Sequence, residues 1–276
     1  MTRHFPPKRI VCLTEETVET LYALGAEDSI VGVSGYAVRP RRVRKEKPRV
    51  SAFISADVPK ILALEPDLVL TFSDLQADIV KELVTAGIAV HAFNQRDVAG
   101  IFAMIRTVGA LIGQPARADS YAAKLEARIE AVKASRPPVS ERPRVYFEEW
   151  DDPLITGIGW VSELIEIAGG IDTFEHLKVE AAARNRIIMP EAVIAAKPDV
   201  IIASWCGKKV RPEKISERPD WSAIPAVQTG RIVEVKSPLI LQPGPAALTD
   251  GLDALVDAIR PEQAIRDTHA AEQLVV

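Results

Sequence analysis

The sequence is poor in the residues from which metal and redox sites are built. Among 276 residues it has only two cysteines and four histidines. No His-x-x-x-His or Cys-x-x-Cys pair occurs, so we predict no zinc or manganese site made by imidazole and thiolate ligands. Cys12 lies in a short apolar run, where a buried free thiol is the expected state; a disulfide with Cys206 is the alternative.

Nucleotide and nucleic-acid signals are missing as well. Neither a Gly-x-Gly-x-x-Gly fingerprint nor a P-loop occurs, and no nucleophile–base pair is evident, so we predict no required cofactor and no catalytic residues. The formal net charge of −4 gives no electrostatic case for binding nucleic acid. Because acidic and basic residues are nearly balanced, the net charge does not indicate a function. The function has to be inferred from the arrangement of individual side chains.

Long apolar runs are also absent. No stretch approaches the roughly 20 residues that a membrane-spanning helix needs. The basic first nine residues lead into only four apolar ones, 10–13, which we interpret as a first β-strand because a secretory leader needs a longer apolar core. We therefore expect a cytoplasmic protein as encoded, or a periplasmic one if a leader has been removed.

What the sequence does contain is an alternation of short apolar strands with helices. Strand patterns at residues 9–13, 29–34, 67–72 and 88–93 are separated by helical patterns at 16–24, 58–64 and 77–86. Nearly all-apolar short strands between helices predict a mostly parallel sheet that is covered on both faces. The alternation restarts with strands at 144–148, 199–204 and 231–235, and a helix at 246–259 closes the chain.

The middle of the chain carries no strand pattern. Residues 101–112 and 116–135 repeat apolar positions at helical spacing, and the second helix would be about 30 Å long. We predict an N-terminal α/β lobe (1–96), a helical connector (97–138) and a C-terminal α/β lobe (139–276). Residues 61–70, ILALEPDLVL, resemble residues 193–202, VIAAKPDVII, which supports two similar Rossmann-like lobes. A common helix–Pro-Asp–strand turn, used twice, is the alternative explanation.

These segments resemble a known family. The chain opening at 9–13, the stretch GAEDSIVGVSGY (25–36), residues 61–69, the turn at 153–157 and the helix at 190–198 look like the helical-backbone class of ABC-importer solute-binding proteins. The cobalamin-binding and ferric siderophore-binding members are the most similar. The resemblance implies a monomer with two lobes, a long connecting helix, a bulky ligand between the lobes and docking of the lobe tips on a membrane permease.

The resemblance also implies where the ligand-binding residues lie. The turns after the strands would face the cleft, and large flat rings there suit a bulky, partly apolar ligand such as a corrinoid. Ordinary core packing is the alternative for any one of these aromatic residues. The predicted aromatic contacts are Tyr36, Phe53, Phe72, Trp150, Trp160 and Trp205.

Two further groups of charged residues are candidates, the first from its place on loops beside the expected cleft and the second from the resemblance. Arg184 and Arg186 could bind carboxylates or a phosphate, and Lys208 and Lys209 could extend this positive wall, which would suit haem or an anionic siderophore. A solvated loop is the alternative. For permease docking, Glu191 matches the second-lobe acid of the family, whereas the first-lobe position falls on Pro59, with Asp57 nearby.

Together the residues and the resemblance predict a binding protein, not an enzyme, which holds cobalamin or another metal chelate for ABC-type import. A ferric siderophore or haem binder, and a cytoplasmic relative without a role in transport, are the alternatives. An enzyme that uses the acidic cluster at 148–152 is the rival from another class.

Overall fold

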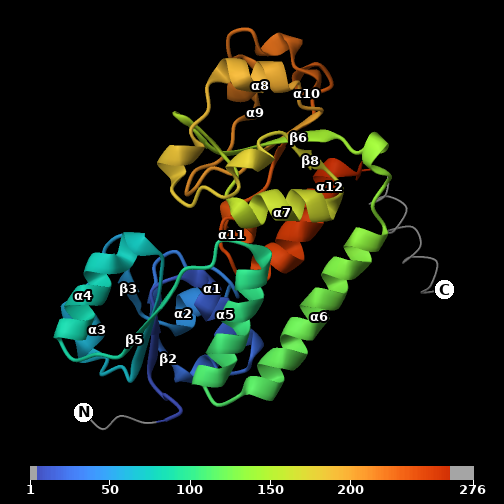
Figure 1. Cartoon of the computed structure of the whole chain (residues 1–276). Coiled ribbons are helices and arrows are strands. Elements are labelled where there is room, and N and C mark those ends of the chain that lie inside the picture. The colour runs from blue at the N-terminus through green and yellow to red at the C-terminus, as the bar shows by residue number, and fades with distance from the viewer. Residues whose placement is uncertain (1–4, 262–276) are drawn as a thin grey trace. The chain divides into compact units, whose positions relative to one another are not determined.

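The computed structural model describes residues 5–261, which form two compact units. Unit 1 takes the chain up to Glu126 together with Gln242–Ala246; unit 2 takes Ala127–Leu241 and the chain from Ala247 onward. The predicted connector (97–138) is thus shared between the units, and five residues of the predicted C-terminal lobe belong to unit 1. Figure 1 shows the course of the chain.

Unit 1 contains a five-stranded parallel sheet in the order β3-β2-β1-β4-β5. Its strands are β1 (Ile10–Cys12), β2 (Ile30–Ser34), β3 (Arg49–Ser51), β4 (Leu68–Phe72) and β5 (Val90–Phe93). The order reverses between β1 and β4, and open parallel sheets bind ligands outside the carboxyl ends of the strands at such a switch point. Strand β3 was not predicted, because Arg49-Val50-Ser51 holds a single apolar residue.

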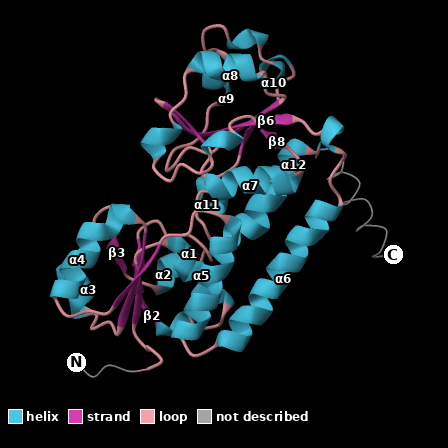
Figure 2. Ribbon diagram, viewed as in Figure 1, coloured by secondary structure: helices cyan, strands magenta, loops and turns pink. Residues whose placement is uncertain are grey.

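Helices cover both faces of this sheet (Figure 2). Val11, Leu13 and Val69 pack on one face against Ile61 and Leu83. The intervening strand residues point to the opposite face, which α1 and α5 cover. The helices are α1 (Glu15–Ala23), α2 (Val43–Glu46), α3 (Val58–Ala63), α4 (Ala77–Thr85), α5 (Val98–Leu111) and the start of α6 (Pro115–Ala134).

The 20-residue helix α6 confirms the long helix expected from the middle of the chain. A rise of about 1.5 Å per residue makes it about 30 Å long. Its first turns lie against α5 at Gly109, where a Cβ atom would stand 2.1 Å from the Cβ of Ala118. Only glycine at position 109 lets the two helices approach so closely. In the part of the chain described, no helix is long and apolar enough to cross a membrane.

Unit 2 contains a sheet in the order β10-β9-β6-β7, with β8 also paired to β6. Its strands are β6 (Arg144–Asp151), β7 (Leu154–Thr156), β8 (Ile171–Asp172), β9 (Val200–Ala203) and β10 (Ile232–Glu234). All pairings are parallel except that of β6 with β7. The predicted turn at 153–157 is therefore mostly a strand: the chain reverses at Asp152-Pro153, and the next three residues pair back on β6.

The two faces of this sheet are buried by different helices. Tyr146, Ile201 and Trp205 belong to one core cluster, to which α8, α9 and α10 contribute. Helices α7 and α12 contact each other, and α12 also contacts β9. The helices are α7 (Gly159–Ala168), α8 (Pro190–Ala196), α9 (Pro212–Ser216), α10 (Pro225–Gln228), α11 (Ser237–Ile240) and α12 (Leu252–Ile259). The predicted closing helix is interrupted, because a π-helical turn at Ala247–Gly251 precedes α12.

The sequence repeat corresponds to a repeated structure. In each unit a helix (α3 or α8) leads through a Pro-Asp turn into a strand (β4 or β9), which pairs with the first strand of the sheet. The residue before each proline has a φ of 46°. The Asp67 carboxylate accepts a hydrogen bond from the N–H of Arg9, and the Asp199 carboxylate accepts one from the N–H of Arg144. The same carboxylate–backbone bond thus fixes the first strand of both units.

Candidate functional site

The switch point of unit 1 is held together by one buried amide, Gln76. Its Nε2 donates to the carbonyl oxygens of Leu13 (3.2 Å) and Phe53 (2.7 Å), and its Oε1 accepts from the N–H of Phe72 (3.1 Å). These partners follow β1, follow β3 and end β4. One side chain therefore fixes three strand ends and positions two of the predicted aromatic residues.

The predicted aromatic residues of unit 1 differ in exposure. Tyr36 is 50% exposed on the turn after β2, and Phe53 is half-buried. Phe72 is buried, and the Arg96 guanidinium lies 5.0 Å from its ring centre. Tyr36 and Phe53 therefore keep accessible surface, whereas Phe72 is covered.

Two exposed aliphatic side chains on the same turns escaped the sequence analysis. Ile54 follows β3 and is 69% exposed, and Leu75 follows β4 and is 59% exposed. The signal was present, because Ile54 directly follows the predicted contact Phe53 and Leu75 lies three residues beyond Phe72. Together with Tyr36 they give three successive strand ends an accessible apolar side chain.

Three acids lie near the start of α1. Glu15 and Glu16 are buried, and burial raises the pKa of Glu15 to about 7 and that of Glu16 to about 8. The Thr14 hydroxyl donates to Glu16 Oε1 (2.6 Å). Glu19 forms an ion pair with Arg39. A Thr-Glu-Glu sequence is an ordinary helix start, so its burial could not be recognised from the sequence.

The strand ends of unit 2 are organised around a buried carboxylate, Glu148. Arg218 donates to it through Nη1 (2.6 Å) and Nη2 (2.9 Å), and Trp205 donates through Nε1 (3.0 Å). The Tyr146 hydroxyl is the fourth donor, at 3.2 Å. Burial, with the Glu148 charge next, raises the pKa of Tyr146 well above its usual value, so the phenol stays protonated.

Arg186, a predicted ligand contact, lies in a second buried ion pair. Its Nη1 and Nη2 donate to Glu149 (2.7 and 3.1 Å), and Nη1 also donates to the carbonyl of Thr156. The side chain is 1% exposed. Arg186 is therefore buried within unit 2 and does not form the exposed basic surface that was predicted. Arg184 is exposed.

Lys208 has a third acid as its partner. Its ammonium forms an ion pair with Asp151 and lies 4.2 Å from the ring centre of Trp150. The Trp205 ring centre is 5.0 Å away. Such cation–π contacts hold the lysine over the two indoles. Trp150 is half-buried and remains accessible, whereas Trp205 is 3% exposed and belongs to the core.

The remaining predicted residues are placed as follows. Trp160 is buried, and its Nε1 donates to the carbonyl of Ile240 (2.8 Å). Glu191 is exposed in the first turn of α8. Asp57 is exposed and caps α3, because its Oδ1 accepts from the N–H of Lys60 (3.0 Å). All four tryptophans lie in unit 2, the fourth being Trp221 in its core.

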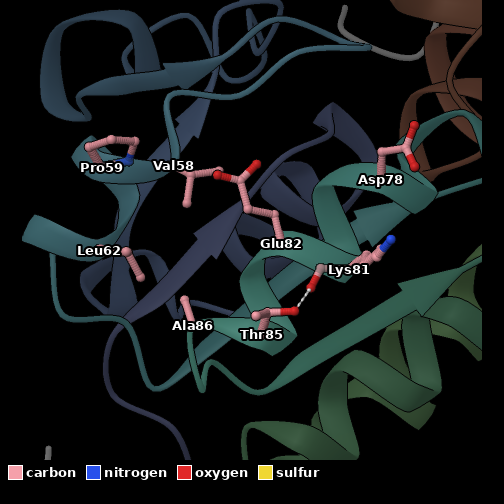
Figure 3. Close-up of a pocket in the computed structure, with 8 residues that line it drawn as sticks. All are labelled: Val58, Pro59, Leu62, Asp78, Lys81, Glu82, Thr85 and Ala86. Atoms are coloured by element: carbon pink, nitrogen blue, oxygen red, sulfur yellow. Dashed lines mark hydrogen bonds between the residues drawn. The ribbon is translucent and has the colours of Figure 1, made fainter.

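Beside α3 lies a separate surface groove of about 620 Å³, which α4 borders on its other side (Figure 3). Val58, Leu62 and Ala86 contribute apolar atoms, and Glu82 lies at its rim. None of the predicted ligand contacts lines this groove. It is therefore distinct from the strand ends described above.

The described residues offer no ready metal site. Within 5–261, no group of three or more His, Cys, Asp or Glu side chains is placed to hold a metal ion. Cys12 is a free, buried thiol and Cys206 is exposed, and burial raises the pKa of Cys12 to about 12. The expectation of a buried free thiol at Cys12 is confirmed.

Comparison with known proteins gives a consistent result. The family described as "Periplasmic binding protein" matches residues 10–239. An uncharacterized ABC transporter substrate-binding lipoprotein of Bacillus subtilis, YvrC, is 28% identical over 93% of this chain and 81% of its own length. A cobalamin-binding protein of Halobacterium salinarum is 26% identical over 87% of this chain, which spans 66% of that relative.

Solved structures show the same fold. The periplasmic heme-binding protein RhuT of Roseiflexus sp. RS-1 has a TM-score of 0.78 at 26% identity, covering 92% of this chain and 99% of its own. The periplasmic vitamin B12-binding protein BtuF of Vibrio cholerae has a TM-score of 0.73 at 22% identity, covering 94% and 98%. The expectation of two α/β lobes with mostly parallel sheets is confirmed.

The buried ion pair at Glu148 yields a stability prediction. Replacing Arg218 by Ala should lower the free energy of unfolding of unit 2 by about 3–5 kcal/mol, because it leaves a buried carboxylate without its counter-charge. Urea denaturation followed by circular dichroism measures this loss. Lys133→Ala, which removes an exposed ion pair with Glu130 on α6, is the control and should cost less than about 1 kcal/mol. Equal effects of the two substitutions would contradict the structural role assigned to Arg218.

Proposed function

This chain belongs to the periplasmic binding protein family, and from that membership we propose that it binds a corrinoid such as cobalamin for ABC-type import. The chain is a substrate-binding protein of the ABC-import type. It is a binding protein and not an enzyme, so the acidic cluster at 148–152 has a structural and ligand-facing role rather than a catalytic one.

The names of the relatives support a corrinoid. Cobalamin-binding or vitamin B12-binding proteins from Halobacterium, Vibrio and Yersinia are 24–26% identical to the chain. Heme-binding proteins occur among the structural neighbours, so family membership alone leaves the ligand open between these classes. The side chains at the strand ends favour the corrinoid.

The observation that carries the proposal is the internal pairing of charge in unit 2. Glu148, Glu149 and Asp151 each have a basic partner within the unit. The charges of these three acids and their three basic partners therefore cancel. Two of the partners are arginines, which would otherwise be able to bind a ligand carboxylate through two hydrogen bonds. Surroundings with so little surplus charge favour a ligand whose periphery carries amides, as a corrin does, over one that carries several carboxylates.

The strand ends of unit 1 support the same ligand class. Tyr36, Ile54 and Leu75 expose apolar surface on three successive turns. Large exposed apolar side chains gathered in one region commonly mark a binding surface. A bulky, partly apolar ligand would bury this area, and the rigid ring of Tyr36 would be ordered at little entropic cost.

Haem is the second candidate, and one observation favours it. Arg184 and Lys209 are exposed and could bind the two propionate groups of a haem. An anionic ferric siderophore would use the same side chains. These two residues lie outside the three ion pairs described above, so they are the positions to examine if an anionic ligand is found.

The ligand can be tested with purified protein and three probes: cyanocobalamin, haemin and a ferric catecholate siderophore. Cobalamin at about 100 times its Kd should stabilise the protein by about 2.7 kcal/mol and so raise Tm by several degrees. A change in the visible spectrum of the corrin should accompany the shift in Tm. A shift with haemin alone would replace the corrinoid by haem, and no response to any probe would refute the proposal that a metal chelate is the cargo.

Tyr36 offers a test of the predicted site. Tyr36→Ala should raise the Kd for cobalamin about tenfold, which corresponds to about 1.4 kcal/mol. The Tm of the unliganded protein should change little, because the ring is half-exposed. Phe5→Ala, which removes an 84% exposed ring outside the strand ends, is the control. An unchanged Kd in the Tyr36 variant would remove this turn from the site.

Docking to a permease rests on Glu191 in unit 2, with Asp57 as the acid of unit 1. Glu191→Ala should leave the Kd for the ligand unchanged and reduce the stimulation of the partner permease's ATPase activity, since exposed acids commonly steer association. Glu213→Ala is a matched control: Glu213 also directly follows the first-turn proline of a helix in unit 2, α9. Equal stimulation of the ATPase by the wild type and both variants would show that Glu191 does not contribute to docking on the permease.

A further inference from the structure

Residues Gln242–Ala246, here called the strap, form part of unit 1 although they lie near the end of the chain. Gln242 Nε2 donates to Glu15 Oε1 (3.3 Å), and the N–H of Ala246 donates to Glu19 Oε2 (3.0 Å). Both acids belong to α1. Gln95, after β5, donates through Nε2 to the strap carbonyl of Pro243 (3.0 Å). Polar contacts therefore hold both ends and the middle of the strap.

The centre of the strap lies directly on Glu16. A Cβ atom at Gly244 would stand 2.4 Å from the Cβ and 3.0 Å from the Cα of Glu16. No side chain larger than hydrogen fits at that distance. The strap thus covers the base of the Glu16 side chain, which is fully buried.

The two acids beneath the strap are buried without a basic partner of their own. Glu15 Oε2 and Glu16 Oε2 accept no hydrogen bond from the described residues. A buried carboxylate oxygen in this situation pays the full cost of lost hydration, whereas a protonated one is neutral. Burial, followed by repulsion between the acids, raises the pKa of Glu15 to about 7 and that of Glu16 to about 8.

The other titratable groups around these acids do not offset this cost. Glu19, on the same helix, adds negative charge, and its own partner is Arg39. On β1, beneath the helix, the Cys12 thiol stays protonated, since its pKa is raised to about 12. On α6, burial raises the pKa of Tyr121 to about 12 as well. The strap itself carries no charged side chain.

We propose that the strap is a pH-dependent latch, docked on α1 while Glu15 and Glu16 hold their protons and released when these carboxyls ionise. Ionisation gives the two protons to solvent and leaves two negative charges beside Glu19. Ionised carboxylates in this position need hydration, which the docked strap opposes because Gly244 lies against Glu16.

The direction of the pH effect follows from proton linkage. The pKa values of about 7 and about 8 in the folded protein lie above the ordinary value of 4.5, so between these limits the folded protein holds more protons than the unfolded chain. Stability contributed by this region is therefore present in acid and falls as the pH rises toward about 8. The latch is closed in acid and opens in mild alkali.

Hydrogen exchange of the Ala246 amide, followed by NMR on the full chain, tests the latch directly. This amide bonds to Glu19 and is protected only while the strap is docked. After correction for the intrinsic exchange rate, we expect its protection to fall about tenfold or more between about pH 6 and about pH 8.5. The Leu13 amide, bonded to Leu70 in the sheet of unit 1, should keep its protection and serves as the reference.

Two variants separate the latch from other causes. Glu15→Gln together with Glu16→Gln keeps the shape of both side chains but removes their ionisation, so protection of Ala246 should no longer depend on pH. Gly244→Ala places a methyl group against Glu16 and should give low protection already at about pH 6.

Three results would overturn the proposal. The first is a wild-type Ala246 protection that stays constant with pH. The second is the same pH dependence in the double glutamine variant. The third is a joint loss of protection at Ala246 and Leu13, which would indicate unfolding of the whole unit. The test does not depend on the identity of the ligand.

Discussion

Helices cover both faces of each sheet, so the turns after the strands are where polar side chains can meet a ligand. This constraint applies to both units. Strand residues such as Val11 and Ile201 are buried, and every residue of the central strands β4 and β9 is buried. Each unit meets the constraint with one buried polar side chain at its strand ends. Gln76 bonds three backbone segments in unit 1, and Glu148 accepts four donors in unit 2. Satisfied buried groups of this kind make the surrounding turns rigid, which a preorganised binding surface requires.

The two units solve the same problem with different electrostatics. Unit 2 pairs Glu148 with Arg218 and Glu149 with Arg186. Unit 1 buries Glu15 and Glu16 without bases, so burial favours the protonated forms. This difference arises from two related architectures, since the same helix–Pro-Asp–strand segment sets up the first strand of each sheet.

Much of the fold could be predicted from the sequence because it depends on local patterns. The apolar runs at β1, β4 and β9, the breaks around α6 and the repeated Pro-Asp turn are all written in a few adjacent residues. Strand β3 was missed because its sequence, Arg49-Val50-Ser51, holds a single apolar residue, and β7 fell within the turn predicted at 153–157. The site was harder to predict, since its contacts join distant residues: Arg218 reaches Glu148 across 70 positions, and Arg186 reaches Glu149 across 37. An arginine in a loop looks the same in sequence whether it is solvated, bound to a ligand or buried against an acid. The strap was missed for the same reason, because no local pattern says that five residues near the end of the chain belong to the first unit.

The distribution of the indole rings has a practical consequence. All four tryptophans lie in unit 2, and unit 1 has tyrosines but no tryptophan in its sequence segments. Fluorescence excited at the red edge of the indole band therefore reports on unit 2 alone. The ammonium of Lys208, held over Trp150 and close to Trp205, places a charge beside two of these emitters. Any event that moves this lysine will change the emission of the protein, while rearrangements confined to unit 1 will be silent in that channel. The four tryptophans are thus an intrinsic fluorescent probe of unit 2.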